Sequence, residues 1–141
     1  MRTYVNGFMV DLESRAGVLI QKARPAFQSG KWNGVGGKVE HGENPWEAMV
    51  REFREETGIE TQVTDWEYMF VLHGDIYRVH FFRHVVQVWP RPEVQQMTDE
   101  HVQWCQLDVI LSAEETLAST KWVIPMMLDP QVKGPFTVYH E

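Results

Sequence analysis

The chain lacks the features that mark secreted and membrane-spanning proteins. It has one cysteine, Cys105, which cannot form an internal disulfide. Because Cys105 stands beside Trp104, we expect a thiol buried in the core. The first residues contain no long apolar run, so the sequence predicts neither a secretory signal nor a membrane span. These absences indicate a protein of the reducing cytoplasm.

Positive charge is also scarce. Thirteen Lys and Arg residues stand against 20 Asp and Glu residues, a formal net charge of −7 at pH 7. A protein that binds duplex nucleic acid needs a basic surface, so this balance argues against that class. It does not exclude a polyphosphate substrate, because a bound cation reverses the sign of the local field.

Repeats, linkers and low-complexity segments are absent as well. The 141 residues are 43% hydrophobic and 12% aromatic, which is typical of an ordinary globular protein. That length suits one domain with one core, and we expect it to span residues 1–141. The sequence leaves open whether two copies form a homodimer.

What the chain does have is a dense group of carboxylates on a predicted helix. Asn44 is a good N-cap, and Pro45 falls at the first helical position, where its missing N–H does no harm. Gly58 supplies a residue that can turn left-handed and end the helix. Apolar residues inside the segment recur at helical spacing and form one core-facing stripe: Trp46, Met49, Val50 and Phe53.

Three glutamates lie away from the centre of that stripe. At about 100° per residue, Glu52, Glu55 and Glu56 fall within an arc of roughly 100° and can converge on one ion. Such a cluster is unfavourable without a positive partner. Its hard oxygen ligands suit Mg²⁺ or Mn²⁺. The alternative is a solvated acidic face on which Arg51 and Arg54 form surface ion pairs.

The segment from Gly37 to Ile59 resembles the Nudix box, Gly-x5-Glu-x7-Arg-Glu-U-x-Glu-Glu-x-Gly-U, where U is an apolar residue. Every specified position is met, by Gly37, Glu43, Arg51, Glu52, Phe53, Glu55, Glu56, Gly58 and Ile59. A chance match at nine such positions has a probability on the order of one in a billion per site. The resemblance implies metal-assisted cleavage of a diphosphate bond in a small nucleotide substrate.

The resemblance also implies roles for individual residues. Glu55 and Glu56 would bind the metal, and Glu52 would act as a ligand or as the general base. Glu55 is the other candidate for the base, because related enzymes differ in the carboxylate that serves. Arg51 would orient a box carboxylate through a bidentate pair. The carbonyl of Gly36 would complete the metal shell.

Two further carboxylates have expected places. Glu43 would hold its loop against the helix rather than contact the substrate. A later loop often supplies one more acidic ligand in this family, and Asp99 or Glu100 occupies that place. We favour Glu100, and the alternative for either residue is a solvated loop charge.

Outside the box, the pattern predicts a mixed sheet interleaved with helices, which fits an α/β/α sandwich, the fold that the Nudix resemblance also implies. The segment Arg24–Lys31 reads as a loop that leads into a Gly34–Gly37 turn and a short strand through Val39. Thr120–Leu128 reads as a helix that Pro125 shortens or kinks. We expect strands at Tyr4–Leu12, Gly17–Lys22, Trp66–Leu72, Ile76–Val88, Val102–Leu107 and Phe136–Tyr139.

The substrate is less constrained than the chemistry. The segment from Lys31 to Val39 resembles the entry to the box in MutT-type members that hydrolyse oxidised purine nucleoside triphosphates. By that resemblance, Asn33 would hydrogen-bond the base and Phe27 would line its pocket. Trp32 and Trp122 are candidates to stack on a base, and the alternative is that they fill the core. The candidates to bind phosphates are Lys22, Arg24 and Lys38, with plain solvation as the alternative.

The chain also departs from those MutT-type members. They read the oxidised purine with a Trp and two neighbouring Asp residues, whereas Thr116–Ser119 at the matching place offers no carboxylate and no indole. The leading hypothesis is therefore a Mg²⁺- or Mn²⁺-dependent hydrolase that cleaves a nucleoside triphosphate, with the base left open. The alternatives are a pyrophosphatase for ADP-ribose or a dinucleoside polyphosphate, and a non-hydrolytic nucleotide-binding regulator. His80 and His84 share one strand face, where we expect half-buried rather than catalytic side chains.

Overall fold

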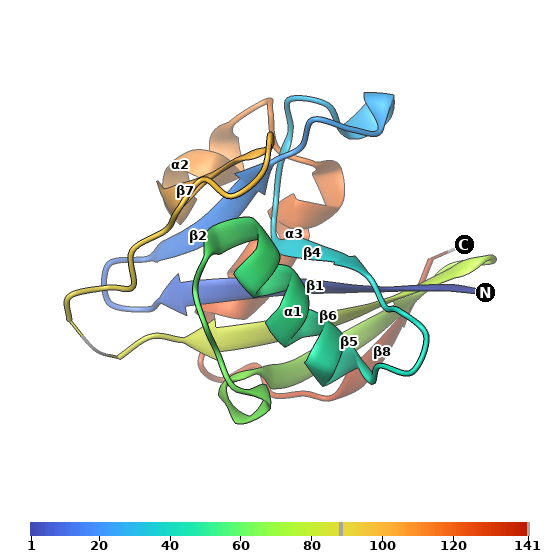
Figure 1. The fold of residues 1–141 in the computed structure, drawn as a ribbon. Coiled ribbons are helices and arrows are strands. Elements are labelled where there is room, and N and C mark those ends of the chain that lie inside the picture. The colour runs from blue at the N-terminus through green and yellow to red at the C-terminus, as the bar shows by residue number, and fades with distance from the viewer. Residues whose placement is uncertain (88, 141) are drawn as a thin grey trace.

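The computed structural model describes residues 1–87 and 89–140, which build one eight-stranded sheet with helices on both faces (Figure 1). The helices are α1 (Pro45–Thr57), α2 (Leu107–Ser112) and α3 (Ala118–Leu128), with short 3₁₀ turns at Ala26–Gln28 and Val63–Asp65. The strands are β1 (Arg2–Asp11), β2 (Ala16–Gln21), β3 (Trp32–Asn33), β4 (Val35–Lys38), β5 (Glu67–His73), β6 (Tyr77–Val85), β7 (His101–Gln106) and β8 (Phe136–Tyr139).

The sheet is mixed, as predicted. Its main path runs β3-β2-β1-β6-β5-β8, with β4 paired to β1 and β7 paired to β2. The pairs β1–β6 and β5–β8 are parallel, whereas the other pairs of these strands are antiparallel. Strand β1 therefore contacts β6 on one side and both β2 and β4 on the other, which makes it the centre of the sheet.

Alternation along β1 divides the interior into two cores. Val5 and Met9 pack on the face that α1 covers, together with Met49 and Phe53 of that helix. The even-numbered Phe8 packs on the opposite face, in the core beneath α2 and α3. Successive strand residues point to opposite faces, so a single strand supplies both cores. Figure 1 shows α1 separated by the sheet from α2 and α3, which confirms the α/β/α sandwich.

Most expected elements are present. Strands β5 and β6 form the predicted hairpin, although the last residue of the predicted strand, Val88, lies outside the described residues. Helix α3 begins at Ala118 and continues through Pro125. Helix α2, of six residues, was not expected. Among the described residues, no helix has the length and apolar character needed to cross a membrane.

The expected turn at Gly34–Gly37 is wrong, because residues 35–38 form strand β4, paired antiparallel with β1. The glycines are explained by close approach rather than by turning. A Cβ at Gly36 would lie 2.8 Å from the carbonyl carbon of Val5, and one at Gly37 would lie 2.6 Å from Glu52 Oε2. Neither glycine has a positive φ. These two positions exclude side chains for lack of space, so the backbone stays extended.

Helix α1 begins and ends as predicted. The Asn44 side chain accepts a hydrogen bond from the Glu47 amide, and the Glu47 carboxylate accepts one from the Asn44 amide, so the two residues form a capping box. Gly58 has φ 75°, the left-handed conformation expected at the helix end. Two local signals therefore set the length of the helix that carries the carboxylates.

The isolated thiol and the strand histidines also lie as expected. Cys105 is buried, and burial raises the pKa of its thiol to about 11. His80 and His84 are half-buried on one face of β6, and burial lowers the pKa of each imidazole. We therefore assign none of these three residues a role in catalysis.

Candidate functional site

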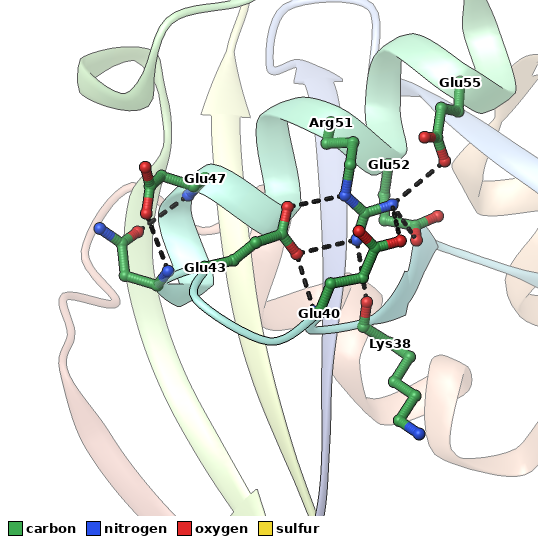
Figure 2. Close-up of polar contacts among 8 residues, drawn as sticks. Lys38, Glu40, Glu43, Glu47, Arg51, Glu52 and Glu55 are labelled. Atoms are coloured by element: carbon green, nitrogen blue, oxygen red, sulfur yellow. Dashed lines mark hydrogen bonds and ion pairs between the residues drawn. The ribbon is translucent and has the colours of Figure 1, made fainter.

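The site is organised around Arg51, whose guanidinium hydrogen-bonds to three glutamates and forms a longer ion pair with a fourth, Glu40, at 3.6 Å (Figure 2). Its Nε donates to Glu43 Oε2 at 2.7 Å, and its Nη2 donates to Glu43 Oε1 at 2.9 Å, so this pair is bidentate. Nη1 donates to Glu52 at 2.9 Å and to Glu55 at 3.1 Å. Because the side chain is 15% exposed, these charge-assisted bonds are well shielded from water. The Glu43 hydrogen bond and the charges of Glu43 and Glu52 raise the pKa of Arg51, which stays a cation.

Glu43 holds the loop that joins β4 to α1, as expected from the sequence. Besides its two bonds from Arg51, its carboxylate accepts the amide N–H of Glu40 at 2.8 Å. Arg51 Nη2 also donates to the carbonyl of Lys38 at 2.9 Å. The hydrogen bond from Arg51 lowers the pKa of Glu43, so this glutamate is a stable anion. The loop is thereby fastened to the helix at both of its ends.

Glu52 lies between α1 and β4, and Glu55 lies at the surface. The Glu52 side chain is 12% exposed and sits against Gly37, where a Cβ would fill its space. Burial raises the pKa of Glu52, although the Arg51 hydrogen bond opposes the shift. The Glu55 side chain is 51% exposed and keeps one contact, to Arg51. The two candidates for the general base therefore have very different surroundings.

Glu56 is joined to the later loop by a residue that the sequence did not single out. Thr98 Oγ1 donates to Glu56 Oε2 at 3.1 Å and accepts the amide N–H of Glu100, also at 3.1 Å. Burial raises the pKa of Glu56, and the negative charge of Glu100 raises it further. The only local signal for Thr98 is a hydroxyl two residues before an acidic residue, which is a common turn pattern.

Glu100 is buried, with 5% of its surface exposed. Its carboxylate accepts the amide N–H of Ala23 at 2.5 Å and the ammonium of Lys22 at 3.3 Å. The neighbouring Asp99 pairs instead with Arg24 at the surface. Of the two candidate loop ligands, Glu100 is thus the one that turns inward, toward Glu56.

The donor set is compatible with a hard divalent cation. Glu52, Glu56 and Glu100 offer only oxygen; burial raises the pKa of Glu52 and Glu56, and the negative charge of neighbouring carboxylates adds to that increase. Gly36, whose carbonyl was expected to join Glu52, Glu55, Glu56 and Glu100 as a donor, precedes Gly37 in β4. Within residues 1–87 and 89–140, no three His, Cys, Asp or Glu side chains already enclose a metal position. Arg51 instead pairs with Glu52, and Lys22 pairs with Glu100.

Asn33, the residue expected to hydrogen-bond a base, is the second residue of the short strand β3. Asn33 Oδ1 accepts hydrogen bonds from Asn6, from Thr120 Oγ1 at 2.9 Å and from the Gly34 amide. Neither Asn6 nor Thr120 was identified from the sequence, because their approach depends on how β1 and α3 pack. The side-chain oxygen of Asn33 is therefore already hydrogen-bonded. Its side-chain NH₂ group has no hydrogen-bond acceptor in the described part of the chain and remains available to a ligand.

The aromatic candidates differ in exposure. Phe27 is 69% exposed on the loop after β2, and Trp122 is 41% exposed on α3, where its ring lies 5.9 Å from that of Phe70. Trp32 is half-buried, packs against the α2–α3 core and meets the His101 ring edge-on at 6.0 Å. Phe27 and Trp122 present ring surface to solvent, whereas Trp32 mostly fills the core.

The basic candidates divide in the same way. Lys22 and Arg24 are paired with Glu100 and Asp99, so both tie the loop after β2 to the segment before β7. Lys38 is exposed, and its ammonium forms no ion pair with a described residue. In Figure 2 its side chain points away from the Arg51 cluster. Lys38 is thus the one of the three whose charge is not already matched within the part of the chain that the structure describes.

Comparison with known proteins finds relatives by sequence. The sequence model of the NUDIX domain matches residues 2–125. The oxidized purine nucleoside triphosphate hydrolase of Danio rerio is 30% identical over 115 residues, which cover 79% of this chain and 71% of the relative. The CTP pyrophosphohydrolase of Escherichia coli (strain K12) is 33% identical over 99 residues, covering 64% of this chain and 68% of the relative.

Solved structures show the same fold. The crystal structure of the MutT protein from Bacillus halodurans has a TM-score of 0.73 at 24% identity, and the match covers 99% of this chain and 90% of that one. A bifunctional NMN adenylyltransferase/ADP ribose pyrophosphatase from Francisella tularensis has a TM-score of 0.75 at 20% identity, covering 92% of this chain and 41% of that one. At these identities the likeness concerns the fold alone.

Proposed function

Since the chain belongs to the NUDIX domain family, we propose that it is a divalent-metal-dependent hydrolase that cleaves a nucleoside triphosphate to the monophosphate and pyrophosphate. Relatives named as hydrolases of nucleoside triphosphates support the reaction class. The complete box supports catalysis rather than mere binding, because Arg51 and all the box glutamates are present. Nothing in the described residues favours ADP-ribose or a dinucleoside polyphosphate over a triphosphate, so those substrates enter as outcomes of the test.

One observation carries the proposal: the segment before β7 brings a buried carboxylate close to a glutamate of helix α1. Helix α1 supplies Glu52 and Glu56, and the segment before β7 supplies Glu100, joined to Glu56 through Thr98. Burial raises the pKa of both helix carboxylates even though Arg51 donates a hydrogen bond to Glu52, so a bound cation would stabilise their charged form. Strained electrostatics of this kind are typical of functional sites rather than of solvated faces.

In the proposed site, the metal would be held by Glu52, Glu56 and Glu100 with the carbonyl of Gly36, and Glu55 is the further candidate ligand. When bound, a divalent cation neutralises phosphate oxygens and activates a water molecule. The protein's own contribution is to place the donors. Gly37 leaves room for the Glu52 carboxyl group, and Thr98 holds Glu56 by one hydrogen bond.

The general base would be Glu52 or Glu55. The raised pKa of Glu52 makes it a stronger base than a solvated glutamate, whereas the exposure of Glu55 gives it freedom to reach a water molecule. Arg51 donates to both through Nη1 and so keeps either carboxylate oriented. Phosphoryl transfer depends mainly on such positioning and on charge compensation.

Different residues are proposed to contact the base and the phosphates of the substrate. Asn33 would donate its NH₂ group to the base, with Phe27 and Trp32 beside it, and Arg24 and Lys38 would attract the phosphates. Thr120 occupies the Asn33 oxygen, so the amide orientation is set before any ligand arrives. The absence of a carboxylate in Thr116–Ser119 argues against strict selection of oxidised purines.

A product-resolved substrate panel tests this function. Ordinary and oxidised nucleoside triphosphates, ADP-ribose and a dinucleoside polyphosphate are each incubated with the full chain and Mg²⁺ or Mn²⁺. Phosphate and pyrophosphate are measured separately, with chelator-treated protein and Glu56→Gln as controls. We expect metal-dependent pyrophosphate release from triphosphates. Turnover confined to ADP-ribose, or tight nucleotide binding without turnover, would replace the proposal with the corresponding alternative.

A further inference from the structure

A pocket lies beside the box loop, which is the loop from Lys38 to Pro45 that joins β4 to α1. Its volume is about 420 Å³, and its wall combines the start of β1, residues Arg78 and His80 of β6, and the loop from Lys38 to Pro45. In Figure 1 this loop, between β4 and α1, lies at the same end of the molecule as the N-terminus. The pocket shares Lys38 and Glu43 with the surroundings of the proposed catalytic site, and Arg51 links Glu43 to Glu52, so the two sites adjoin each other.

Arg78 is the distinctive residue of this pocket. Strand register pairs it with Thr3 and pairs His80 with Val5, so both side chains lie on the α1 face of the sheet. Arg78 is half-buried, and its Nε is shielded from solvent without a hydrogen-bond partner in the described structure. The guanidinium also forms no ion pair with any residue in 1–87 and 89–140. A shielded cationic donor without a partner is unfavourable until an anion binds it.

The acidic side chains of the pocket do not serve as that anion. Glu43 is bound to Arg51 through both of its oxygens, and Glu40 Oε1 lies 3.6 Å from Arg51 Nη1. Both carboxylates therefore compensate Arg51 rather than Arg78. Lys38 and Arg2 at the rim add positive charge, and neither forms an ion pair with a described residue. The pocket is thus locally positive in a chain whose formal net charge is −7.

The imidazole on the same wall is oriented by a neighbour. His80 Nδ1 lies 2.8 Å from the Tyr68 hydroxyl, which leaves Nε2 as the nitrogen available to a ligand. When the hydroxyl donates to Nδ1, the ring proton sits on Nε2 and can be donated in turn. Arg78 and His80 would then offer N–H groups from one face of a single strand.

We propose that this pocket binds a phosphate-type anion, inorganic phosphate or pyrophosphate, with Arg78 as its anchor. The planar guanidinium presents parallel N–H donors that match the spacing of phosphate oxygens. The pocket volume is ample for either anion. The proposed function supplies pyrophosphate as a product, and the inference rests on that function only for the source of the ligand. Binding itself requires no catalysis.

Calorimetric titration of the metal-free full chain tests the site. Sodium pyrophosphate and sodium phosphate are titrated separately in the presence of a chelator, so that the unneutralised glutamates repel either anion from the catalytic site. The variant is Arg78→Gln. The matched control is Arg54→Gln, which removes one charge from an exposed arginine of α1 outside the pocket. We expect the Kd for pyrophosphate to rise at least tenfold in Arg78→Gln and to stay unchanged in Arg54→Gln.

A measurement on the unaltered protein guards against a folding defect in the variant. The Nε–Hε resonance of Arg78 in a ¹⁵N spectrum should shift as pyrophosphate is added, together with the amide of Val39 on the same wall. No binding by the wild-type chain, or equal Kd values for wild type and Arg78→Gln, would overturn the proposal. A chain that binds pyrophosphate through Arg78 but hydrolyses no nucleotide would leave this site standing and refute the proposed function.

Discussion

The contrast between two adjacent glycines offers the sharpest test of the site. Gly36→Ala and Gly37→Ala add the same methyl group one residue apart in β4. The new methyl at Gly36 would press on the main chain of β1, 2.8 Å from the carbonyl carbon of Val5. The new methyl at Gly37 would press on the carboxyl group of Glu52, 2.6 Å from Oε2. One substitution therefore strains the sheet, and the other displaces a proposed catalytic group.

The expected magnitudes follow from what has to move. The Glu52 carboxyl group lies at the far end of a flexible side chain and can move away from a new methyl group. Gly37→Ala should therefore change the free energy of unfolding by no more than about 1 kcal/mol. It must shift the carboxyl group by about 1 Å, a misplacement that lowers catalytic rates by roughly 100-fold. Gly36→Ala forces two paired strands apart and should destabilise the fold by about 2–3 kcal/mol. That loss corresponds to a fall in Tm of roughly 6–10 °C.

Two assays on the same preparations separate these effects. Thermal unfolding in a chelator gives the stability of each metal-free variant, and metal-dependent release of pyrophosphate gives turnover. Mn²⁺ titration adds a readout that does not depend on turnover. For Gly37→Ala we expect near-normal Tm, weakened Mn²⁺ binding and a large loss of turnover. Wild-type turnover in Gly37→Ala would refute the placement of Glu52 in the reaction.

Three further predictions concern other residues. Glu56→Gln should lower metal-dependent turnover at least about 100-fold. Burial raises the pKa of Glu56 in the folded state, so ionisation of Glu56 destabilises the fold as pH rises through that pKa. Without metal, Glu56→Gln should therefore be more stable than wild type at pH 7. This difference in stability should disappear toward pH 4, where Glu56 becomes protonated. Thr98→Val should weaken Mn²⁺ binding roughly tenfold in calorimetry, and Thr98→Ser should restore it, because the Thr98 hydroxyl donates to Glu56. Equal Mn²⁺ affinities in wild type and Thr98→Val would mean that Thr98 has no role in metal binding. Arg83→Met should reduce stability in urea by about 3 kcal/mol with turnover per folded molecule unchanged, because the buried guanidinium binds Glu67 and the carbonyls that follow α3.

Local features were predictable where they depend on neighbouring residues. The N-cap Asn44 and the left-handed Gly58 act within one turn of the helix, so both ends of α1 could be read directly. The bidentate pair of Arg51 was implied by the family resemblance, and the structure gives Glu43 as its partner. Strand β4 was predicted as a turn because glycine occurs both where the backbone needs a positive φ and where a neighbour leaves no room for a side chain. The sequence does not distinguish these two reasons. Helix α2 was not predicted because its six residues are too few to show the hydrophobic periodicity of a helix.

The sequence by itself determined the family resemblance, the class of chemistry and the helix that carries the glutamates, because the box is a contiguous stretch with local geometry. Only the tertiary structure decided how Glu56 meets Thr98 across 42 positions and how Lys22 meets Glu100 across 78. It also decided that Arg78 and His80 share a pocket with the box loop. Contacts between distant segments depend on strand order and register, and these arise from packing the whole chain rather than from any one segment of it.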